Sequence, residues 1–575
     1  MTSSASRLVV AVTARPKAAA LALYVGISSL IFGLPLLMSP GRSYVGSHDD
    51  PQIFIWSFAW LPQALLHGHN PLLTEAIWYP GGVNLTWATT VPGLALVMWP
   101  VTAVAGPIAS YNLCAVTLPA LAAWCAYLLG CRLVTSQWAA IIGGFLFGFS
   151  SYMLAQAPGH LHMIAVFPLP LIALVALRYL NGEIGRRGLT VAVGCLMAAE
   201  LLCSTELTFT VTAALCLALV LAYVVWRDRR GELRRMVLPL VGGYALAAII
   251  SAPFLYYAMT GFRMSGFQPA DHYTTDLANL LVPTRINLIG AHLPTGATSG
   301  FPGNDGERDA FLGLALLIPL SWAWRTRRAS MTRFLAAFGL LAIFFSLGSS
   351  LVVFGHRVFP IPGLFGRETL NLPLAGTTHV LLFNNTLPAR LMLFASLAFA
   401  LMFALWTSAA SRGARVVVPL LTILMLLPWP GANTWATATS VPPFFSNAAY
   451  RACLQPGENI LPIPIGADSN SMLWQVAADF RFRMAGGRIA TSPPSPFLHP
   501  SSIAQIAVGY PPGPDTTSLL RKYIAVEHVT TVVLAPSAAR LWRPYIEPIA
   551  PGLPVGGVVV FRVNGAPVPA GCPSL

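Results

Sequence analysis

Residues 227–235 read RDRRGELRR and separate two apolar stretches, residues 208–226 and 237–257. Each apolar stretch is close to the ~20 residues that a helix needs to cross a bilayer. Short loops rich in Lys and Arg remain on the cytoplasmic side of a membrane. We therefore assign this basic loop to the cytoplasm and derive the side of every other loop from it.

The composition excludes a soluble globular protein. Of the 575 residues, 55% are hydrophobic and 9% are charged, and the mean hydropathy is +0.67, whereas about a quarter of a soluble domain is charged. The net charge of +14 would suit a nucleic-acid-binding protein. We exclude that class because the basic residues lie in short loops between apolar stretches, where membrane topology explains them.

Hydropathy predicts an all-α polytopic membrane protein with about eleven transmembrane helices. The predicted spans are residues 18–38, 112–131, 138–156, 163–180, 189–206, 208–226, 237–257, 310–324, 334–354, 391–408 and 416–430. A further apolar stretch, residues 91–105, is short and is interrupted by Pro92, Gly93 and Pro100, as re-entrant or interfacial segments are. Counting it as a span would invert every later loop and move RDRRGELRR outside, so we leave it out.

The resulting topology has a cytoplasmic N-terminus, residues 1–17, and an extracytoplasmic C-terminus. The transmembrane domain covers residues 18–430, and its long outer loops are residues 39–111, 258–309 and 355–390. The inner loops carry many arginines against only the acids Glu183, Asp228 and Glu232. Acids and histidines gather on the outer side, which indicates a protein equipped for chemistry there.

The tail, residues 431–575, is predicted to form a small extracytoplasmic α/β domain. Its stretches ENILPIPIG and HVTTVVLAP are typical of short buried strands. MLWQVAADFRFRMAGG, also in the tail, has helical spacing. Cys453 and Cys572 bracket the region and could form a disulfide in an oxidising compartment.

The segment SHDDP, residues 47–51, follows the first span and contains the adjacent acids Asp49 and Asp50. Two neighbouring carboxylates repel each other, so they suit either a general base or a metal site. An aspartate before Pro51 is also a good helix start. Both roles stay open.

The next stretch, IFIWSFAWLPQALLHG, has Ile53, Trp56, Trp60 and Leu61 at helical spacing. This predicts a helix in the membrane interface, where Trp is favoured. Farther along the same loop, Tyr79 lies in a turn-rich segment. Trp56 and Tyr79 are candidates for contact with a sugar or lipid, and an interfacial aromatic belt is the alternative.

The segment GHLHM, residues 159–163, forms the outer turn between the third and fourth predicted spans. His160 and His162 are two positions apart, so they could share a metal on an extended strand or bind a phosphate or carboxylate. The candidate metal ligands are therefore Asp49, Asp50 and His160. No cofactor is assigned beyond the option of a divalent metal ion.

Further charged candidates lie at the outer ends of later spans. We place Glu200 and Glu206 in the fifth span, with Glu206 at its outer turn, and an acid inside a bilayer indicates a functional site. Glu307 and Asp309 precede the eighth span, where acids at a helix N-terminus are an alternative explanation. Arg390 lies at the start of the tenth span, where its guanidinium could bind a phosphate through two hydrogen bonds. The alternative is that the side chain extends to the membrane interface to keep its charge in water.

The order of these motifs resembles the GT-C superfamily of integral-membrane glycosyltransferases, and bacterial members in particular. The motifs that carry the resemblance are Asp50-Pro51, Trp56, Trp60, Asn70-Pro71, Tyr79-Pro80, Gly82, Asn84-Leu85, Tyr111-Asn112-Leu113, Gly159-His160-Leu161-His162 and the ExxxFLG pattern at Glu307 to Gly313. The resemblance covers roughly residues 18–430. It implies a polyprenyl-phosphate-linked sugar donor, used on the extracytoplasmic face of a bacterial plasma membrane.

From this resemblance we expect hexosyl or pentosyl transfer to a glycan or lipid acceptor. Asp50 or Asp49, with His160, would be catalytic. The substrate and phosphate contacts would be Arg390, His162, Glu206, Glu307, Asp309, Trp56 and Tyr79. The alternatives are a flippase or transporter for lipid-linked saccharides, and a polysaccharide polymerase. The expected partners are the lipid-linked donor, the acceptor and membrane lipids, and not a nucleic acid.

Overall fold

A computed structural model of the chain describes residues 16–38, 41–47, 50–260, 272–294, 296–308, 310–313, 317–325, 330–358, 372, 386–431, 435–466, 469–488, 493–498 and 501–572. The chain divides into two compact units, and each is described by itself. The first unit comprises Met1–Met38, Asn112–Ser251 and Phe267–Ala436. The second comprises Ser39–Tyr111, Ala252–Gly266 and Thr437–Leu575.

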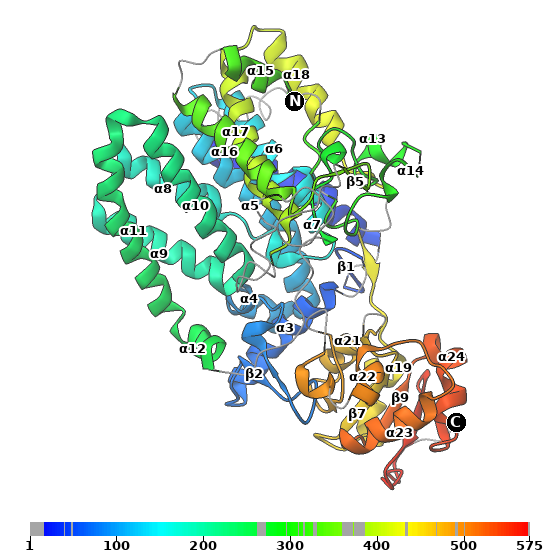
Figure 1. Cartoon of the computed structure of the whole chain (residues 1–575). Helices are drawn as coiled ribbons and strands as arrows, with labels where there is room; N and C mark the ends of the chain where they lie inside the picture. Colours follow the sequence, from blue (N-terminus) through cyan, green and yellow to red (C-terminus); the bar gives the residue numbers. More distant parts are fainter. Residues whose placement is uncertain are drawn as a thin grey trace, which may run out of the picture. The chain divides into compact units, whose positions relative to one another are not determined.

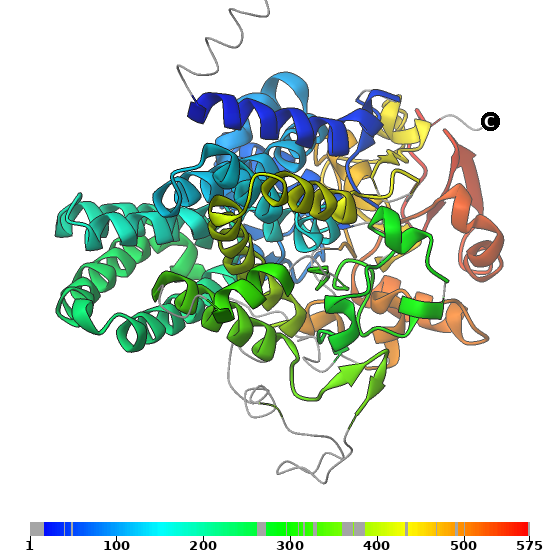
Figure 2. The ribbon, with the colours of Figure 1, turned by 90° about the horizontal axis from the view of Figure 1, so that it is seen from above.

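The first unit is built almost entirely of helices (Figure 1). They are α2 (Pro16–Ser28), α5 (Pro107–Leu133), α6 (Gln137–Gly148), α7 (Ser151–Gln156), α8 (Pro168–Leu180), α9 (Arg186–Cys203), α10 (Thr205–Val225), α11 (Arg230–Ile250), α13 (Leu288–Ala291), α14 (Gly296–Ser299), α15 (Leu317–Arg325), α16 (Ser330–Ser346), α17 (Met392–Ala409) and α18 (Ala414–Leu426). Helix α9 packs along α11 and against α8, as the two views show (Figures 1 and 2).

Among the described residues, seven helices are long and apolar enough to cross a membrane: Pro16–Gly33, Pro107–Leu133, Gln137–Gln156, Leu161–Leu180, Thr205–Val225, Arg227–Ile250 and Pro388–Ala409. Each coincides with a predicted span. The other four predicted spans correspond to α9, α15, α16 and α18, which are shorter or less apolar. Helix α4 (Pro92–Ala105) has 14 residues, so at 1.5 Å per residue it is shorter than a ~30 Å hydrocarbon core. The chain is thus a mostly helical, multi-pass membrane protein.

Small residues allow the central helices of the first unit to approach closely. A Cβ on Gly144 would lie 2.6 Å from the carbonyl oxygen of Ala123, and one on Gly148 would lie 2.6 Å from that of Pro119. Gly143 faces Ala400 on α17. Close backbone approach at Gly and Ala is typical of helix packing in membranes. Helix α17 is buried almost all round, and its N-terminal end carries the Arg390 site described below.

One boundary differs from the prediction. Glu206 does not end the fifth predicted span but lies in the first turn of α10. Helix α9 stops at Cys203 because Ser204 takes an extended conformation and its side chain accepts a hydrogen bond from the backbone N–H of Leu207. A serine in this position caps the next helix and so separates it from the one before.

The second unit contains a five-stranded mixed sheet. Its strand order is β10 (Gly552–Val555), β11 (Val558–Arg562), β9 (Thr531–Leu534), β7 (Asn459–Ile463), β8 (Arg483–Met484). Strand β7 pairs in parallel with β8 and β9, whereas β11 is antiparallel to β9 and β10. The stretches ENILPIPIG and HVTTVVLAP form β7 and β9, both fully buried, as their apolar runs predict.

The other elements of this unit include short helices and hairpins. They are α3 (Asp50–Leu66), α4, α12 (Ala252–Thr260), α19 (Pro443–Ser446), α20 (Tyr450–Cys453), α21 (Ser471–Ala477), α22 (Ser501–Val508), α23 (Thr516–Val526) and α24 (Pro536–Ile546), with β1 (Ser43–Tyr44) paired to β6 (Thr437–Ala438) and β2 (Leu73–Thr74) paired to β3 (Val83–Asn84). The first outer loop and the C-terminal tail therefore share one compact unit and one hydrophobic core.

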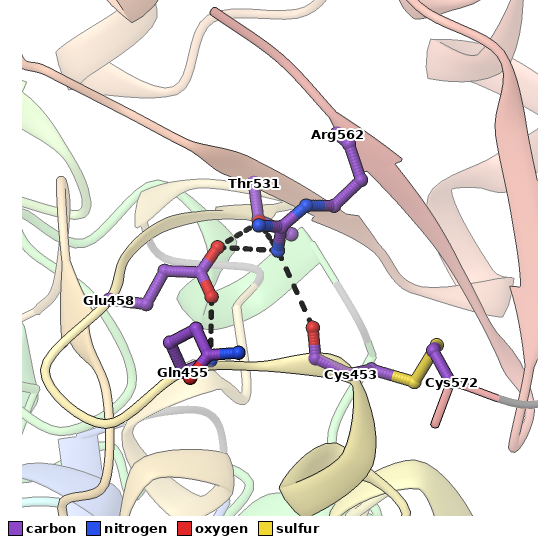
Figure 3. The surroundings of a disulfide bond; sticks show 6 residues. All are labelled: Cys453, Gln455, Glu458, Thr531, Arg562 and Cys572. Atoms are coloured by element: carbon purple, nitrogen blue, oxygen red, sulfur yellow. Dashed lines mark hydrogen bonds and ion pairs between the residues drawn. A yellow bond between two sulfur atoms is a disulfide. The ribbon is translucent and has the colours of Figure 1, made fainter. Parts of the chain in front are cut away.

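A disulfide links Cys453 and Cys572 beside a buried ion pair (Figure 3). Arg562 on β11 donates to a carboxylate oxygen of Glu458 at 2.6 Å and to the hydroxyl of Thr531 at 2.7 Å. The pairing of the two cysteines is confirmed. Because the bond closes a loop of 119 positions, it restricts the unfolded chain strongly.

Helix α3 forms as its spacing predicts, but its environment differs from the prediction. Trp56 is fully buried in the core of the second unit, and its indole N–H donates to the side chain of Gln475 at 2.8 Å. Trp56 also stacks on Trp60, with ring centroids 5.4 Å apart. The prediction that Trp56 and Trp60 lie in the membrane interface is therefore wrong, since both side chains pack inside the protein.

The predicted helix in MLWQVAADFRFRMAGG is correct only in its first half. Helix α21 ends at Ala477, and Asp479 and Phe480 take positive φ angles of 51° and 55°. The following residues form β8, which pairs with Asn459 and Ile460 of β7. Pairing with a partner strand has overridden the local helical spacing.

Candidate functional site

A buried cluster of charges surrounds Arg390 in the first unit. Arg390 lies in the short turn Pro388–Leu391 that leads into α17. Its Nε donates to both carboxylate oxygens of Glu307, at 3.0 and 3.2 Å, and its Nη2 donates to the same carboxylate. Its Nη1 donates to Glu206. The guanidinium is therefore shared by two acids, and the side chains are only 10% (Arg390), 1% (Glu307) and 17% (Glu206) exposed.

Glu307 is held by a tight loop that starts at Asn304. The backbone N–H groups of Gly306 and Glu307 donate to the side chain and carbonyl oxygens of Asn304, respectively, both at 3.0 Å. The side-chain amide of Gln156, at the end of α7, donates to the Gly306 carbonyl at 2.7 Å and to Glu307 at 3.2 Å. The loop and α7 thus fix the carboxylate in front of Arg390.

The pKa of Glu307 reflects two opposing effects. Burial alone would raise it, but the charges of Arg390 and His160 and the hydrogen bonds from Arg390 and Gln156 outweigh burial and lower the pKa below its ordinary value. Glu307 therefore carries its negative charge at neutral pH.

His160 adjoins this cluster. The backbone N–H of His160 donates to the carbonyl of Gln156 at 2.8 Å, and a Cβ on Gly306 would lie 3.3 Å from the imidazole Cε1. His162 is buried, and the two imidazole rings meet edge to face with centroids 6.0 Å apart. The segment folds as a 3₁₀ turn, Leu161–Met163, and not as an extended strand.

The described residues offer no group of three or more His, Cys, Asp or Glu side chains arranged to hold a metal ion. Asp49 and Asp309 lie outside the described residues. The structure therefore brings together four predicted residues, Arg390, Glu206, Glu307 and His160, without the geometry of a metal site in the described part of the chain.

Asp50 forms a second candidate site, in the second unit. Asp50 is the first residue of α3 and is followed in the sequence by Pro51. Oδ1 of Asp50 lies 2.9 Å from Nη2 of Arg488. The Asp50 side chain is 32% exposed and that of Arg488 is 21% exposed. Asp50 thus both begins the helix and remains accessible to a substrate.

Arg488 was not among the predicted residues. It ends the sequence RMAGGR, in which β8 runs into two glycines. The N–H of Trp78 donates to the Gly486 carbonyl at 3.1 Å, and Gly487 has a φ of 147°. A Cβ on Gly487 would lie 3.1 Å from Cβ of Ile77. The glycine pair lets this strand end run against the first outer loop and so brings Arg488 to Asp50.

The remaining predicted residues occupy different environments. Tyr79 is half-buried, and the guanidinium of Arg483 lies 4.6 Å above its ring. Trp56 is a core residue with no exposed surface for a substrate. Glu200 is 1% exposed on α9, and within the described residues neither of its carboxylate oxygens has a hydrogen-bond partner.

Comparison with known proteins identifies one family model. The model of a domain of unknown function, DUF6311, matches residues 21–429. No curated protein matches the chain. The matched region includes Asp50 and the Arg390 cluster, whereas Arg488 and the five-stranded sheet lie beyond it.

Three solved structures are similar to this chain. Arabinofuranosyltransferase AftD from Mycobacteria has a TM-score of 0.57 at 15% identity, over 94% of this chain and 41% of that chain. The archaeal oligosaccharyltransferase AglB from Archaeoglobus fulgidus, in complex with an inhibitory peptide and a dolichol-phosphate, has a TM-score of 0.46 at 15% identity, over 96% and 75%. ArnT from Cupriavidus metallidurans, bound to undecaprenyl phosphate, has a TM-score of 0.41 at 12% identity, over 95% and 99%.

The likeness to AftD shows that this chain has a similar fold. This chain spans less than half the length of AftD. At this level of identity the likeness concerns the fold, and the chemistry must be argued from the residues themselves.

Proposed function

We propose that this chain, which belongs to the DUF6311 family, is a membrane glycosyltransferase that moves a hexose or pentose from a polyprenyl-phosphate donor to a glycan or lipid acceptor. The observation that carries the proposal is the accessible Asp50–Arg488 pair on a GT-C fold. The fold supplies a membrane scaffold for a lipid-linked donor, and the pair supplies a charged, oriented carboxylate.

In this proposal Asp50 is the catalytic base. Its carboxylate accepts the proton of the acceptor hydroxyl as that oxygen attacks the anomeric carbon and the bond to the donor phosphate breaks. Arg488 holds Asp50 in one orientation, since Nη2 of Arg488 donates to Oδ1 of Asp50 at 2.9 Å. Arg488 is thus a positioning residue.

The departing phosphate gains negative charge and needs a cation. Within the first unit we propose Arg390, with His160 beside it, as the group that binds a phosphate of the donor. As Arg390 stands, one cation faces two carboxylates, so a phosphate must take the place of one of them. The phosphate would displace Glu206, because Glu206 makes a single hydrogen bond to Arg390 and its side chain is more exposed than that of Glu307.

The extracytoplasmic face is proposed from two observations. Disulfides persist in oxidising compartments, which supports an extracytoplasmic location for the region that contains Cys453 and Cys572. The arginine-rich loop 227–235 supports a cytoplasmic location for the other face. We therefore propose an extracytoplasmic C-terminal domain (431–575) and a cytoplasmic N-terminus (1–17). We also propose that the transmembrane domain (18–430) crosses a bacterial plasma membrane with eleven spans.

The direct test uses the purified chain in lipid nanodiscs with radiolabelled polyprenyl-phosphate sugars. Release of the lipid phosphate with transfer of label supports the transferase. Movement of the intact donor across a vesicle membrane would instead indicate a flippase, and joining of preassembled repeats would indicate a polymerase.

The variant Asp50→Asn keeps the size of the side chain but removes the base, and we expect transfer to fall about 10²–10⁴-fold. The matched control is Asp515→Asn, an exposed aspartate of the second unit whose side chain makes no cap hydrogen bond to α23. Full activity of Asp50→Asn would remove this residue from the mechanism. Chelation with EDTA, followed by single divalent ions, tests the metal option.

A further inference from the structure

A pocket of about 670 Å³ lies within the second unit, apart from the Asp50–Arg488 pair. Its walls come from the C-terminal end of α3, the β2–β3 hairpin and the segment between α21 and β8. The volume falls in the range of about 300–1,000 Å³ that is usual for small-ligand sites. The mechanism proposed above makes no use of it.

Hydrogen-bonding side chains in the pocket are available to a ligand. Gln63 and His69 line it, and within the described part of the chain neither side chain makes a hydrogen bond that would occupy it. Asn70 uses its amide oxygen to accept from the N–H of Leu72 at 2.9 Å, which leaves the amide N–H₂ group. Amide and imidazole groups both donate and accept, so they match hydroxyl groups well.

The charges of the pocket are already balanced. Its single basic side chain of the Lys/Arg type, Arg483, lies 3.8 Å from Glu75 and stacks over the ring of Tyr79. A phosphate or other anion would find no unengaged arginine among the lining residues. The pocket therefore favours a neutral ligand.

Aromatic side chains complete the lining. Trp60 and Phe480 contribute apolar surface, and they contact each other edge to face with centroids 5.5 Å apart. A sugar ring has an apolar C–H face and a polar hydroxyl rim. It can therefore pack on aromatic rings while its hydroxyls bind amide groups.

We propose that this pocket binds a neutral saccharide segment of the acceptor. The proposal rests on the proposed function, in which a glycan is one acceptor. Trp60 lies ten residues after Asp50 on α3, roughly 15 Å along the helix axis at 1.5 Å per residue. The acceptor chain would then be held at the pocket while its end reaches Asp50.

The test measures saccharide binding separately from donor turnover. Isothermal titration of the full chain in detergent uses linear oligosaccharides of glucose, mannose, galactose and arabinose, three to six units long. We expect at least one of them to bind, and the double variant Gln63→Ala/His69→Ala to weaken its affinity at least tenfold. Gln505→Ala is the matched control, because Gln505 is exposed on α22 outside the pocket.

Donor hydrolysis without acceptor distinguishes the two proposals. The double variant should release lipid phosphate at the rate of the unmodified chain, since it alters no residue of the Asp50 or Arg390 sites. Absence of binding by every oligosaccharide, equal affinity in the double variant, or competition by inorganic pyrophosphate would each overturn the saccharide pocket. Binding without any donor turnover would overturn the transferase and leave the pocket standing.

Discussion

Nη2 of Arg488 lies 2.9 Å from Oδ1 of Asp50, although 438 positions separate the two residues in the sequence. The first outer loop thus obtains the partner of its acid from the C-terminal region, within one compact unit. The C-terminal region is therefore a contributor to the candidate site. Its removal should impair Asp50 even though the match to the family model ends at residue 429.

Substitution of Arg488 tests this relationship. Arg488→Gln removes the charge that orients Asp50, so we expect transfer to fall about tenfold, in line with the loss of one charge-assisted hydrogen bond. Arg488→Lys keeps the charge and should retain an intermediate rate. Initial rates with a labelled donor measure the effect. Arg540→Gln, at an exposed arginine of α24, is the control, and equal rates for both Gln variants would contradict the role.

Substitution of Glu206 tests the exchange proposed at Arg390. Glu206→Gln removes a negative charge that competes with the donor phosphate for the guanidinium. We expect the KM for the donor to fall about three- to tenfold, because a tenfold change in binding corresponds to about 1.4 kcal/mol. Steady-state kinetics over a range of donor concentrations give this value. A higher KM would mean that Glu206 helps to bind the donor and does not compete with it.

Loss of Arg390 should destabilise the first unit. Arg390→Met leaves Glu307, with 1% of its side chain exposed, as an uncompensated buried charge, which costs about 3–5 kcal/mol. Thermal unfolding followed by circular dichroism measures the loss. The double variant Arg390→Met/Glu307→Gln should recover part of it. The control Arg333→Met alters an exposed arginine, and an equal loss there would contradict the prediction.

The disulfide should stabilise the second unit. Because Cys453 and Cys572 close a loop of 119 positions, chain entropy predicts a loss of about 4–5 kcal/mol in Cys453→Ser. Treatment with dithiothreitol should reproduce the loss in the unmodified chain and leave the variant unchanged. Cys195→Ser, at an exposed free cysteine, is the control. Equal unfolding midpoints with and without dithiothreitol would argue against a stabilising bond.

Glu527, at the end of α23, predicts a pH dependence of stability. Burial raises the pKa of Glu527 to about 7, whereas the unfolded carboxyl titrates near 4.3. The folded chain binds more protons between these two values, so this group makes stability fall as the pH rises from about 4.3 to 7, with no further change above.

Glu527→Gln should remove that slope. We expect the variant to be more stable than the unmodified chain at pH 8, by on the order of 1–3 kcal/mol, and equally stable at pH 4. Unfolding midpoints at both pH values measure the difference. Glu547→Gln, at an exposed position, should leave the slope unchanged, and a Glu527→Gln variant with the slope intact would refute the assignment.

Much of the fold follows from local sequence patterns. Seven of the predicted spans coincide with long apolar helices, and the strands β7 and β9 lie where apolar runs predict them. The sequence also predicts four residues of the candidate site, since charged groups at the ends of apolar spans are rare and conspicuous. They are Arg390, Glu206, Glu307 and His160.

Tertiary contacts decided the rest. The sequence by itself determined a helical membrane protein with its reactive groups in identifiable loops, because hydropathy and helical spacing are encoded within about twenty neighbouring residues. Only the tertiary structure shows that Asp50 pairs with Arg488 and that Arg390 pairs with both Glu307 and Glu206. It also shows that Trp56 is buried in a core shared with the C-terminal sheet. These contacts join positions that lie 83 to 438 residues apart in the sequence. The free energy that selects them comes from burial and charge pairing in the folded chain, and a local sequence pattern does not contain this information.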